Sequence, residues 1–262
     1  ISDKVFVVTG GGDGIGREVV LQLLSHGAVV AAFDRRTDSL KQTARMADAG
    51  DRLSLHAVDV TDRGQVERAV ADVIAARGCL DGLLNVAGVI QQFVTVMDLD
   101  YAEIERVMAV NFWGVVHTLK AALPHLLARP EACVINVSSM GALAPVPGQA
   151  AYGASKAAVM LLTEALFAEL LGTPVAVTVV FPGAVRTHIT ENSGVSAPGG
   201  GGEGFSMTSA PDAARQIVDA VEQGVFRVLI GKDAPALDRL ARLSPRRATE
   251  MVARRMGSLI SR

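Results

Sequence analysis

Tyr152 and Lys156 lie four residues apart in the segment Tyr-Gly-Ala-Ser-Lys, a spacing that places both side chains on one face of a helix. A phenol has a pKa of about 10 in water and is a poor base at neutral pH. An ammonium group held nearby favours the phenolate and lowers that pKa. Lowering it to about 7 requires roughly 4 kcal/mol of differential stabilisation. The pair therefore predicts that Tyr152 exchanges a proton with a substrate and that Lys156 lowers the pKa of this tyrosine.

Two further polar residues could assist this proton transfer. Ser139 lies thirteen residues before Tyr152 and follows an apolar run, 133–137, that predicts a buried strand. Ligands of open α/β sheets bind at the carboxyl ends of strands. No Gly-x-Ser-x-Gly turn surrounds Ser139, which argues against a hydrolase nucleophile. Asn111 is an amide within an apolar helical pattern, and its burial requires a partner. A core hydrogen bond and a catalytic role both meet that requirement.

A glycine-rich segment follows the first predicted strand, 5–8, and precedes a predicted helix. Its sequence from Thr9 to Gly16 is Thr-Gly-Gly-Gly-Asp-Gly-Ile-Gly. Such a turn presents backbone N–H groups and a helix N-terminus to an anion, typically a pyrophosphate. A glycine-rich turn without a ligand is the alternative. The segment predicts a dinucleotide site.

The next predicted strand, 29–33, ends in Asp34. A carboxylate at this place accepts hydrogen bonds from a ribose 2′-hydroxyl and repels a 2′-phosphate. Arg35 and Arg36 follow and could hold that phosphate, whereas Asp13 adds a second negative charge. We therefore expect NAD to be preferred over NADP.

Further predicted strands cover 53–58, 83–85, 133–137, 175–181 and 225–230, and they alternate with helical patterns, one of which runs from about residue 97 to 127. This alternation predicts an α/β fold, a Rossmann-like doubly wound sheet of seven mainly parallel strands with helices on both faces. We expect residues 1–262 to form a single domain. Residues 188–209 lose periodicity and contain the run Pro198-Gly-Gly-Gly-Gly202, so we expect a flexible substrate lid there. Residues 233–262 predict a helical extension, rimmed with arginines and broken at Pro245.

Composition limits the classes of partner. Half of the 262 residues are hydrophobic, 20% are charged and the net charge is −2, which argues against a nucleic-acid partner and a polybasic membrane contact. Cys79 and Cys133 do not make a disulfide framework, which fits a reducing compartment. No apolar run approaches the roughly 18 residues of a membrane span. We expect a cytoplasmic protein, although a chain that begins at Ile1 leaves a trimmed leader open.

Taken together, these residues resemble the single-domain branch of the short-chain dehydrogenase/reductase family, over essentially the whole chain. The segment 9–16 matches its cofactor loop, and Asn85-Val-Ala-Gly88 is similar to its Asn-Asn-Ala-Gly motif, with Val86 in place of the second Asn. Asn111, Ser139, Tyr152 and Lys156 fall on its catalytic tetrad. Pro182-Gly183 and Thr187 match its loop over the nicotinamide. The extended branch and the enoyl reductases space these motifs differently and fit less well.

The resemblance implies roles for these residues. Tyr152 would be the general acid/base, and Lys156 would lower its pKa and bind the nicotinamide ribose. Ser139 would orient the substrate oxygen, and Asn111 would hold a water that relays the proton. The implied cofactor contacts are Gly10, Asp13, Gly14, Ile15, Gly16, Asp34, Arg35, Asp59, Val60, Asn85, Ala87, Gly88, Tyr152, Lys156, Pro182, Gly183, Val185 and Thr187. The resemblance implies no metal. It implies a homo-oligomer, either a tetramer or a dimer.

The favoured function is hydride transfer between NAD and a secondary alcohol or ketone. Met140, Val146 and Gln149 are candidate pocket residues and are largely apolar, which favours a hydrophobic substrate. One alternative is a dinucleotide-binding regulatory or scaffold protein without turnover. Another is an NADP-dependent ketoacyl-thioester reductase, against which Asp34 argues.

Overall fold

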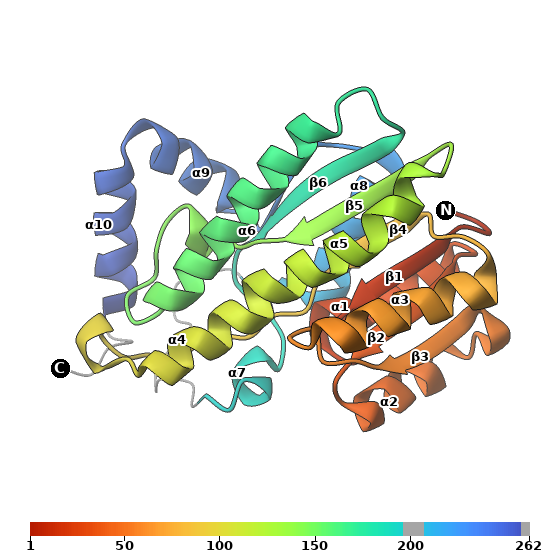
Figure 1. The fold of residues 1–262 in the computed structure, drawn as a ribbon. Helices are drawn as coiled ribbons and strands as arrows, with labels where there is room; N and C mark the ends of the chain where they lie inside the picture. Colours follow the sequence, from red (N-terminus) through yellow and green to blue (C-terminus); the bar gives the residue numbers. More distant parts are fainter. Residues whose placement is uncertain (196–206, 258–262) are drawn as a thin grey trace.

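The computed structural model describes residues 1–195 and 207–257. Its centre is a sheet of seven strands, all parallel, in the order β3-β2-β1-β4-β5-β6-β9 (Figure 1). The strands are β1 (Val5–Thr9), β2 (Val29–Asp34), β3 (Leu53–Ala57), β4 (Gly82–Asn85), β5 (Ala132–Val137), β6 (Val175–Pro182) and β9 (Arg227–Ile230). The order reverses between β1 and β4, where the carboxyl ends of strands diverge and leave room for a ligand. The predicted fold class is confirmed.

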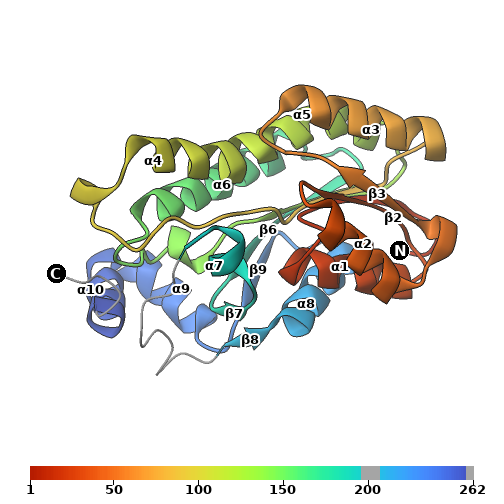
Figure 2. The same cartoon turned by 90° about the horizontal axis from the view of Figure 1, so that it is seen from below.

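Helices cover both faces of this sheet (Figure 2). One face carries α3 (Arg63–Arg77), α4 (Tyr101–Met108), α5 (Gly114–Leu127) and α6 (Ala150–Glu169); the other carries α1 (Gly14–Ser25), α2 (Thr37–Ala47) and α8 (Ala210–Gln223). Successive side chains of a strand point to opposite faces. In β1, Val5 and Val7 accordingly pack into the core beneath α3 and α5, whereas Phe6 and Val8 pack into the core beneath α1 and α8. Two apolar layers thus hold the strand ends in place.

The helix predicted from about residue 97 to 127 begins later, at Tyr101, and contains a π-helical turn. The chain forms α4 and α5, with a π-helical turn, Ala109–Trp113, between them. Such turns insert one extra residue into a helix and often occur at functional sites. Here the turn contains Asn111, whose side chain is fully buried.

The segment after β6 has more structure than its lost periodicity predicted. It contains β7 (Val185–Arg186), α7 (Ile189–Asn192) and β8 (Thr208–Ser209), and β7 pairs with β8 in a small parallel sheet. Part of the predicted lid, including the glycine run 198–202, lies outside the described residues. The C-terminal extension forms α9 (Ala234–Leu243) and α10 (Pro245–Met256), with the predicted break at Pro245. Among the helices of the described ranges, none is both long and apolar enough to cross a membrane.

Candidate active site

A cavity of about 620 Å³ lies at the carboxyl edge of the sheet. Its lining runs from Asp34 at the end of β2, past the loop after β1, to Tyr152 on α6. The edge at which these strands end is the place where α/β sheets bind ligands. The cavity therefore contains both regions that the sequence singled out, the glycine-rich loop and the Tyr-Lys pair.

The glycine-rich loop folds tightly against the neighbouring strand. Gly10 has a φ of +72°, and a Cβ atom there would lie 3.0 Å from the backbone of Ala87. A Cβ atom at Gly16 would lie 2.1 Å from the Gly10 oxygen, so only glycine allows the turn to close. Asp13 caps α1 by accepting a hydrogen bond from the Gly14 N–H at 2.7 Å. The start of α1 thereby faces the cavity, an arrangement that suits a phosphate group.

The carboxylate of Asp34 is fixed by the backbone around it. Its Oδ2 accepts a hydrogen bond from the Gly12 N–H at 3.1 Å, and its Oδ1 accepts one from the Arg36 N–H at 2.9 Å. A Cβ atom at Gly12 would lie 2.7 Å from Oδ2, so glycine is needed for this approach. Asp34 therefore presents a fixed negative charge to the cavity beside the glycine-rich loop.

Arg36, which could have held a 2′-phosphate, is turned toward acidic and amide groups instead. Its guanidinium lies 3.5 Å from Asp13 and 3.8 Å from Asp34, and it donates a hydrogen bond to Asn192. Arg35 lines the cavity. The positive charge at this end of the cavity is thus partly neutralised by the protein's own carboxylates.

The same Asp13 joins the glycine-rich loop to the segment after β7. Asn192 donates a hydrogen bond to Asp13 at 2.9 Å, and the His188 ring nitrogen lies 3.3 Å from the carboxylate. Burial favours the protonated acid, but the hydrogen bonds of Asn192, Gly14 and His188 outweigh it and lower the pKa of Asp13 to about 2. No sequence spacing could have revealed this contact, because Asp13 and Asn192 lie 179 residues apart.

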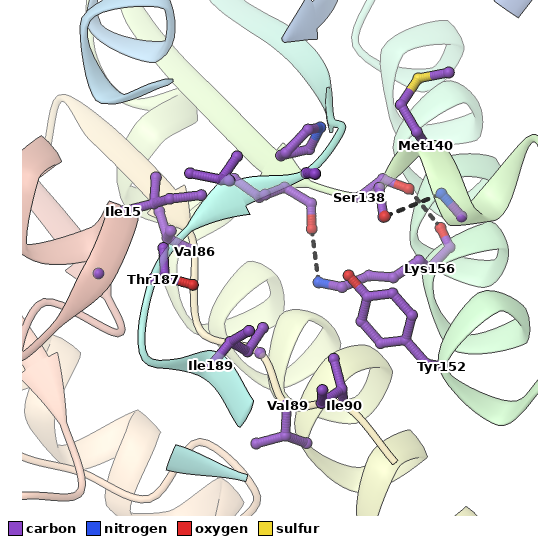
Figure 3. Close-up of a pocket in the computed structure, with 18 of the residues that line it drawn as sticks. Ile15, Val86, Val89, Ile90, Ser138, Met140, Tyr152, Lys156, Thr187 and Ile189 are labelled. Carbon is purple, nitrogen blue, oxygen red and sulfur yellow. Dashed lines mark hydrogen bonds between the residues drawn. The ribbon is translucent and has the colours of Figure 1, made fainter. Parts of the chain in front are cut away.

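Tyr152, Ser139 and Lys156 also line the cavity, and the close-up shows the side chains of Tyr152 and Lys156 next to each other (Figure 3). Ser139 shares a hydrogen bond with the Tyr152 hydroxyl, and its own Oγ accepts a hydrogen bond from the Gly141 N–H at 3.0 Å. The Lys156 ammonium donates to the Val137 carbonyl at 2.9 Å. A Cβ atom at Gly88 would lie 3.2 Å from that ammonium, so a glycine after β4 makes room for it. The end of β5 and the first turns of α6 together position the three groups.

The pKa of Tyr152 differs from the prediction. Burial raises it above its ordinary value, and the hydrogen bond with Ser139 offsets only part of that effect. Burial also lowers the pKa of Lys156 to about 8. The predicted depression of the tyrosine pKa by Lys156 is therefore not seen here, because the desolvation of the phenolate dominates and the ammonium is engaged by Val137.

Two predicted site residues, Asn111 and Asn85, do not line the cavity. The Asn111 side chain exchanges hydrogen bonds with the main chain of Val89, each at 2.9 Å, and donates to Ser155 at 2.9 Å. Both N–H groups of this amide are thereby used, and its Oδ1 accepts one hydrogen bond. Asn85 donates to Asn136 and accepts from Thr118, so its amide ties β4 to β5 and α5. Both amides act here as internal braces of the elements beside the cavity.

All the other predicted site residues line the cavity. They are Gly10, Asp13, Gly14, Ile15, Gly16, Asp34, Arg35, Asp59, Val60, Ala87, Gly88, Ser139, Tyr152, Lys156, Pro182, Gly183, Val185 and Thr187. The sequence did not show that the C-terminal helices line the cavity. They contribute Leu237 from α9 and Val252 and Met256 from α10. Their helical spacing predicted packing, but it did not show what they pack around.

Gln91 is a further residue that the sequence did not single out. Its Oε1 accepts hydrogen bonds from the Ala151 N–H at 2.7 Å and the Tyr152 N–H at 3.1 Å, and its Nε2 donates to the Gly148 carbonyl at 2.9 Å. The first N–H groups of a helix have no partner within the helix. Gln91, which is fully buried, supplies the acceptor for two of these N–H groups from a distant loop. It thereby fixes the turn that carries Tyr152.

Comparison with known proteins gives consistent matches. The family model described as short chain dehydrogenase matches residues 4–196. A Mycobacterium tuberculosis protein named as the oxidoreductase SadH is 39% identical over 251 residues, which cover 92% of this chain and 90% of that protein. The 2-(R)-hydroxypropyl-CoM dehydrogenase of Xanthobacter autotrophicus is 33% identical over 193 residues, covering 72% of this chain and 77% of that protein. A crystal structure of a short chain dehydrogenase/reductase from Burkholderia phymatum in complex with NAD aligns with a TM-score of 0.83 at 26% identity, covering 92% of each chain.

Proposed function

This chain belongs to the short-chain dehydrogenase family of oxidoreductases, and from that premise we propose that it transfers hydride between NAD and a secondary alcohol or ketone. The observation that carries this proposal is the cavity itself. It joins a glycine-rich loop and a fixed Asp34 carboxylate at one end to Tyr152, Ser139 and Lys156 at the other.

The residues present fit a dinucleotide. The start of α1 and the main chain of 14–16 suit the pyrophosphate, and Asp34 suits the hydroxyls of the adenosine ribose. Lys156 lies near the opposite end, where it suits the nicotinamide ribose. When bound, NAD accepts the hydride that leaves the alcohol carbon.

The chain's own residues handle the proton. In alcohol oxidation, Tyr152 in its phenolate form takes the hydroxyl proton while the C–H bond gives up its hydride, so the carbon–oxygen bond becomes a carbonyl. Ser139 donates a hydrogen bond to the same substrate oxygen and keeps it beside the phenol. A protonated Lys156 would oppose the effect of burial, which raises the pKa of Tyr152, and would so favour the phenolate. In the reverse direction Tyr152 returns the proton to the ketone oxygen.

We propose that NAD is preferred over NADP. The support is the fixed charge of Asp34 together with the pairing of Arg36 with Asp13 and Asp34. A 2′-phosphate would lie next to the Asp34 carboxylate. It would also compete with the carboxylates of Asp13 and Asp34 for the Arg36 guanidinium.

We propose further that residues 1–262 act as one domain and assemble into a homo-oligomer. Support for one domain is that α9 and α10 line the same cavity as the glycine-rich loop. Support for assembly is the exposed apolar surface of Met97, Tyr101 and Trp113, on and beside α4. Light scattering coupled to size-exclusion chromatography tests this point.

The test of the function is the absorbance of the reduced nicotinamide. The protein is incubated with NAD and a panel of hydrophobic secondary alcohols, and with NADH and the matching ketones. We expect turnover with at least one pair. Binding of NAD(H) without turnover of any pair would instead favour the regulatory or scaffold alternative.

A further inference from the structure

Gln149 carries an unsatisfied buried acceptor within the substrate end of the cavity. Its side chain lines the cavity and the residue is only 4% exposed. Its Oε1 atom has no hydrogen-bond partner among the described residues. Buried polar atoms are almost always hydrogen-bonded, and an unpaired one costs about 1–3 kcal/mol. This atom therefore indicates a partner that the protein chain does not supply.

The orientation of this amide is fixed by Gln91. The Gln149 Nε2 donates a hydrogen bond to the Gln91 carbonyl at 2.7 Å. Exchanging the amide nitrogen and oxygen would bring two acceptor oxygens to that distance, which is unfavourable. The main chain of Gln149 is also held, because its N–H donates to Val146 and its carbonyl accepts from Gly153. The free atom is thus an acceptor, and its partner must be a donor.

Gln149 is also close in the chain to the proposed proton donor. It immediately precedes α6, and Tyr152 lies three residues later on the first turn of that helix. The side chains of both residues line the same cavity. The nearby cavity residues Met140 and Val146 carry no side-chain group that could donate strongly to Oε1. A substrate whose reacting oxygen meets Tyr152 would therefore bring its adjacent atoms toward Gln149.

We propose that Gln149 accepts a hydrogen bond from a second hydroxyl group of the substrate, on the carbon next to the reacting one. The substrate class is then a hydrophobic vicinal diol in the oxidation direction and an α-hydroxyketone in the reduction direction. This inference rests on the proposed function and deepens it. A site built to bond a substrate hydroxyl discriminates strongly against the analogue that lacks it.

The test uses ketone pairs that differ only in this hydroxyl: acetoin against butanone, and benzoin against deoxybenzoin. The ratio of kcat/KM within each pair is measured with NADH for the wild type and for Gln149→Met, a change of similar length that removes the acceptor. In the wild type we expect the hydroxyketone to be favoured by about 10–100-fold, which corresponds to roughly 1.4–2.7 kcal/mol. In Gln149→Met the ratio within each pair should fall by about 10–100-fold relative to the wild type. Differences in intrinsic reactivity cancel because the two proteins are compared on the same pair.

A readout without turnover separates this inference from the proposed function. With NADH bound, the hydroxyketone should raise the Tm of the wild type more than the plain ketone does, and Gln149→Met should lose the difference. Gln92→Met, a change of the same type at an exposed glutamine, should keep it. An unchanged kcat/KM ratio, or equal Tm shifts from both members of a pair in the wild type, would overturn the assignment and leave a buried water as the partner of Oε1. Absence of turnover with a retained difference in Tm would instead contradict the proposed function alone.

Discussion

The ammonium of Lys156 lies 2.9 Å from the Val137 carbonyl oxygen, at the carboxyl end of β5. This contact fixes the position of the lysine, but one hydrogen bond to a carbonyl is weaker than the hydration that a buried ammonium loses. Burial accordingly lowers the pKa of Lys156 from 10.5 to about 8. The buried charge of Lys156 therefore lowers the stability of the folded protein. It lies next to the proposed acid/base Tyr152, as expected of a trade-off between stability and activity.

The first prediction concerns the pH dependence of that cost. Between about pH 8 and 10.5 the unfolded state binds more protons at Lys156 than the folded state, so the stability contribution of this group rises with pH across that window and is lowest below it. Lys156→Met removes this dependence. The free energy of unfolding of the variant relative to the wild type should therefore fall by about 2–3 kcal/mol from pH 7 to pH 10.

Urea denaturation at both pH values measures this difference. Lys120→Met, at an exposed lysine of α5, is the matched control. A Lys156→Met advantage that stays constant from pH 7 to pH 10 would mean that the pKa of Lys156 is not lowered in the folded protein.

The second prediction concerns the proton. Tyr152→Phe keeps the ring and removes the hydroxyl that shares a hydrogen bond with Ser139. Turnover should fall by at least about 10²–10⁴-fold, the typical loss for a general acid or base. NADH binding, followed by fluorescence titration, should be unchanged. Tyr101→Phe, at the exposed tyrosine of α4, is the control, and activity of Tyr152→Phe within a few-fold of wild type would remove Tyr152 from the mechanism.

The third prediction makes Gln91 a positioning residue. Gln91→Met leaves the Ala151 and Tyr152 N–H groups and the Gly148 carbonyl without their partner. We expect a loss of about 2–4 kcal/mol of stability, because buried polar groups without partners are costly. At a temperature where the variant is folded, kcat should fall about tenfold or more, since small displacements of reacting groups are expensive. The Kd for NAD should change little, since the Asp34 end of the cavity is untouched.

The control is Gln92→Met, at the exposed neighbour of Gln91, for which kcat and the free energy of unfolding are measured in the same way. Loss of stability in Gln91→Met with unchanged kcat would show that the cap supports the fold without positioning Tyr152.

The contrast between Tyr152 and Gln91 shows how far the sequence alone could lead. Tyr152 and Lys156 could be predicted because helical geometry converts a spacing of four residues into a shared face. The strands could be predicted because they are buried on both sides and read as apolar runs. Gln91 caps a helix 60 residues away, and no local pattern records such a partner.

The same limit applies to the two asparagines that do not line the cavity. The residue types of Asn85 and Asn111 are compatible with a ligand contact or with an internal brace. Only the positions of Val89, Ser155, Asn136 and Thr118, brought together by folding, show that these side chains form hydrogen bonds inside the protein. The π-helical turn at Asn111 likewise interrupts an apolar pattern that reads as continuous.

The fourth prediction concerns the segment after β7. Asn192 bonds Asp13 and Arg36, and these contacts hold α7 against the glycine-rich loop. Asn192→Ala should raise hydrogen-exchange rates of the amides in 189–195 by about tenfold, the equivalent of roughly 1.4 kcal/mol of local stability. In the wild type, NADH together with a substrate ketone should slow exchange in 188–195, as expected of a segment that closes over the site. Equal protection with and without both ligands would count against a lid.

The fifth prediction is the cofactor preference. A 2′-phosphate carries close to two negative charges, and a unit charge pair at about 4 Å costs roughly 4 kcal/mol even at an effective dielectric of 20. Arg35 and Arg36 offset part of this cost, but Arg36 is already paired with Asp13 and Asp34. We expect NAD to be favoured over NADP by about 10²-fold in kcat/KM, equivalent to roughly 2.7 kcal/mol.

Asp34→Ala should remove most of that preference, because it deletes the repelling charge and frees Arg36 from one of its two acidic partners. The remaining pair with Asp13 should keep the variant from becoming strongly specific for NADP. Asp38→Ala deletes the same charge at a fully exposed position of α2 and should leave the preference intact, which separates local repulsion from a change in net charge. Measurement of kcat/KM with both cofactors on the three proteins decides the matter. A wild type that prefers NADP, or an Asp34→Ala variant that discriminates as the wild type does, would show that Asp34 does not select the cofactor.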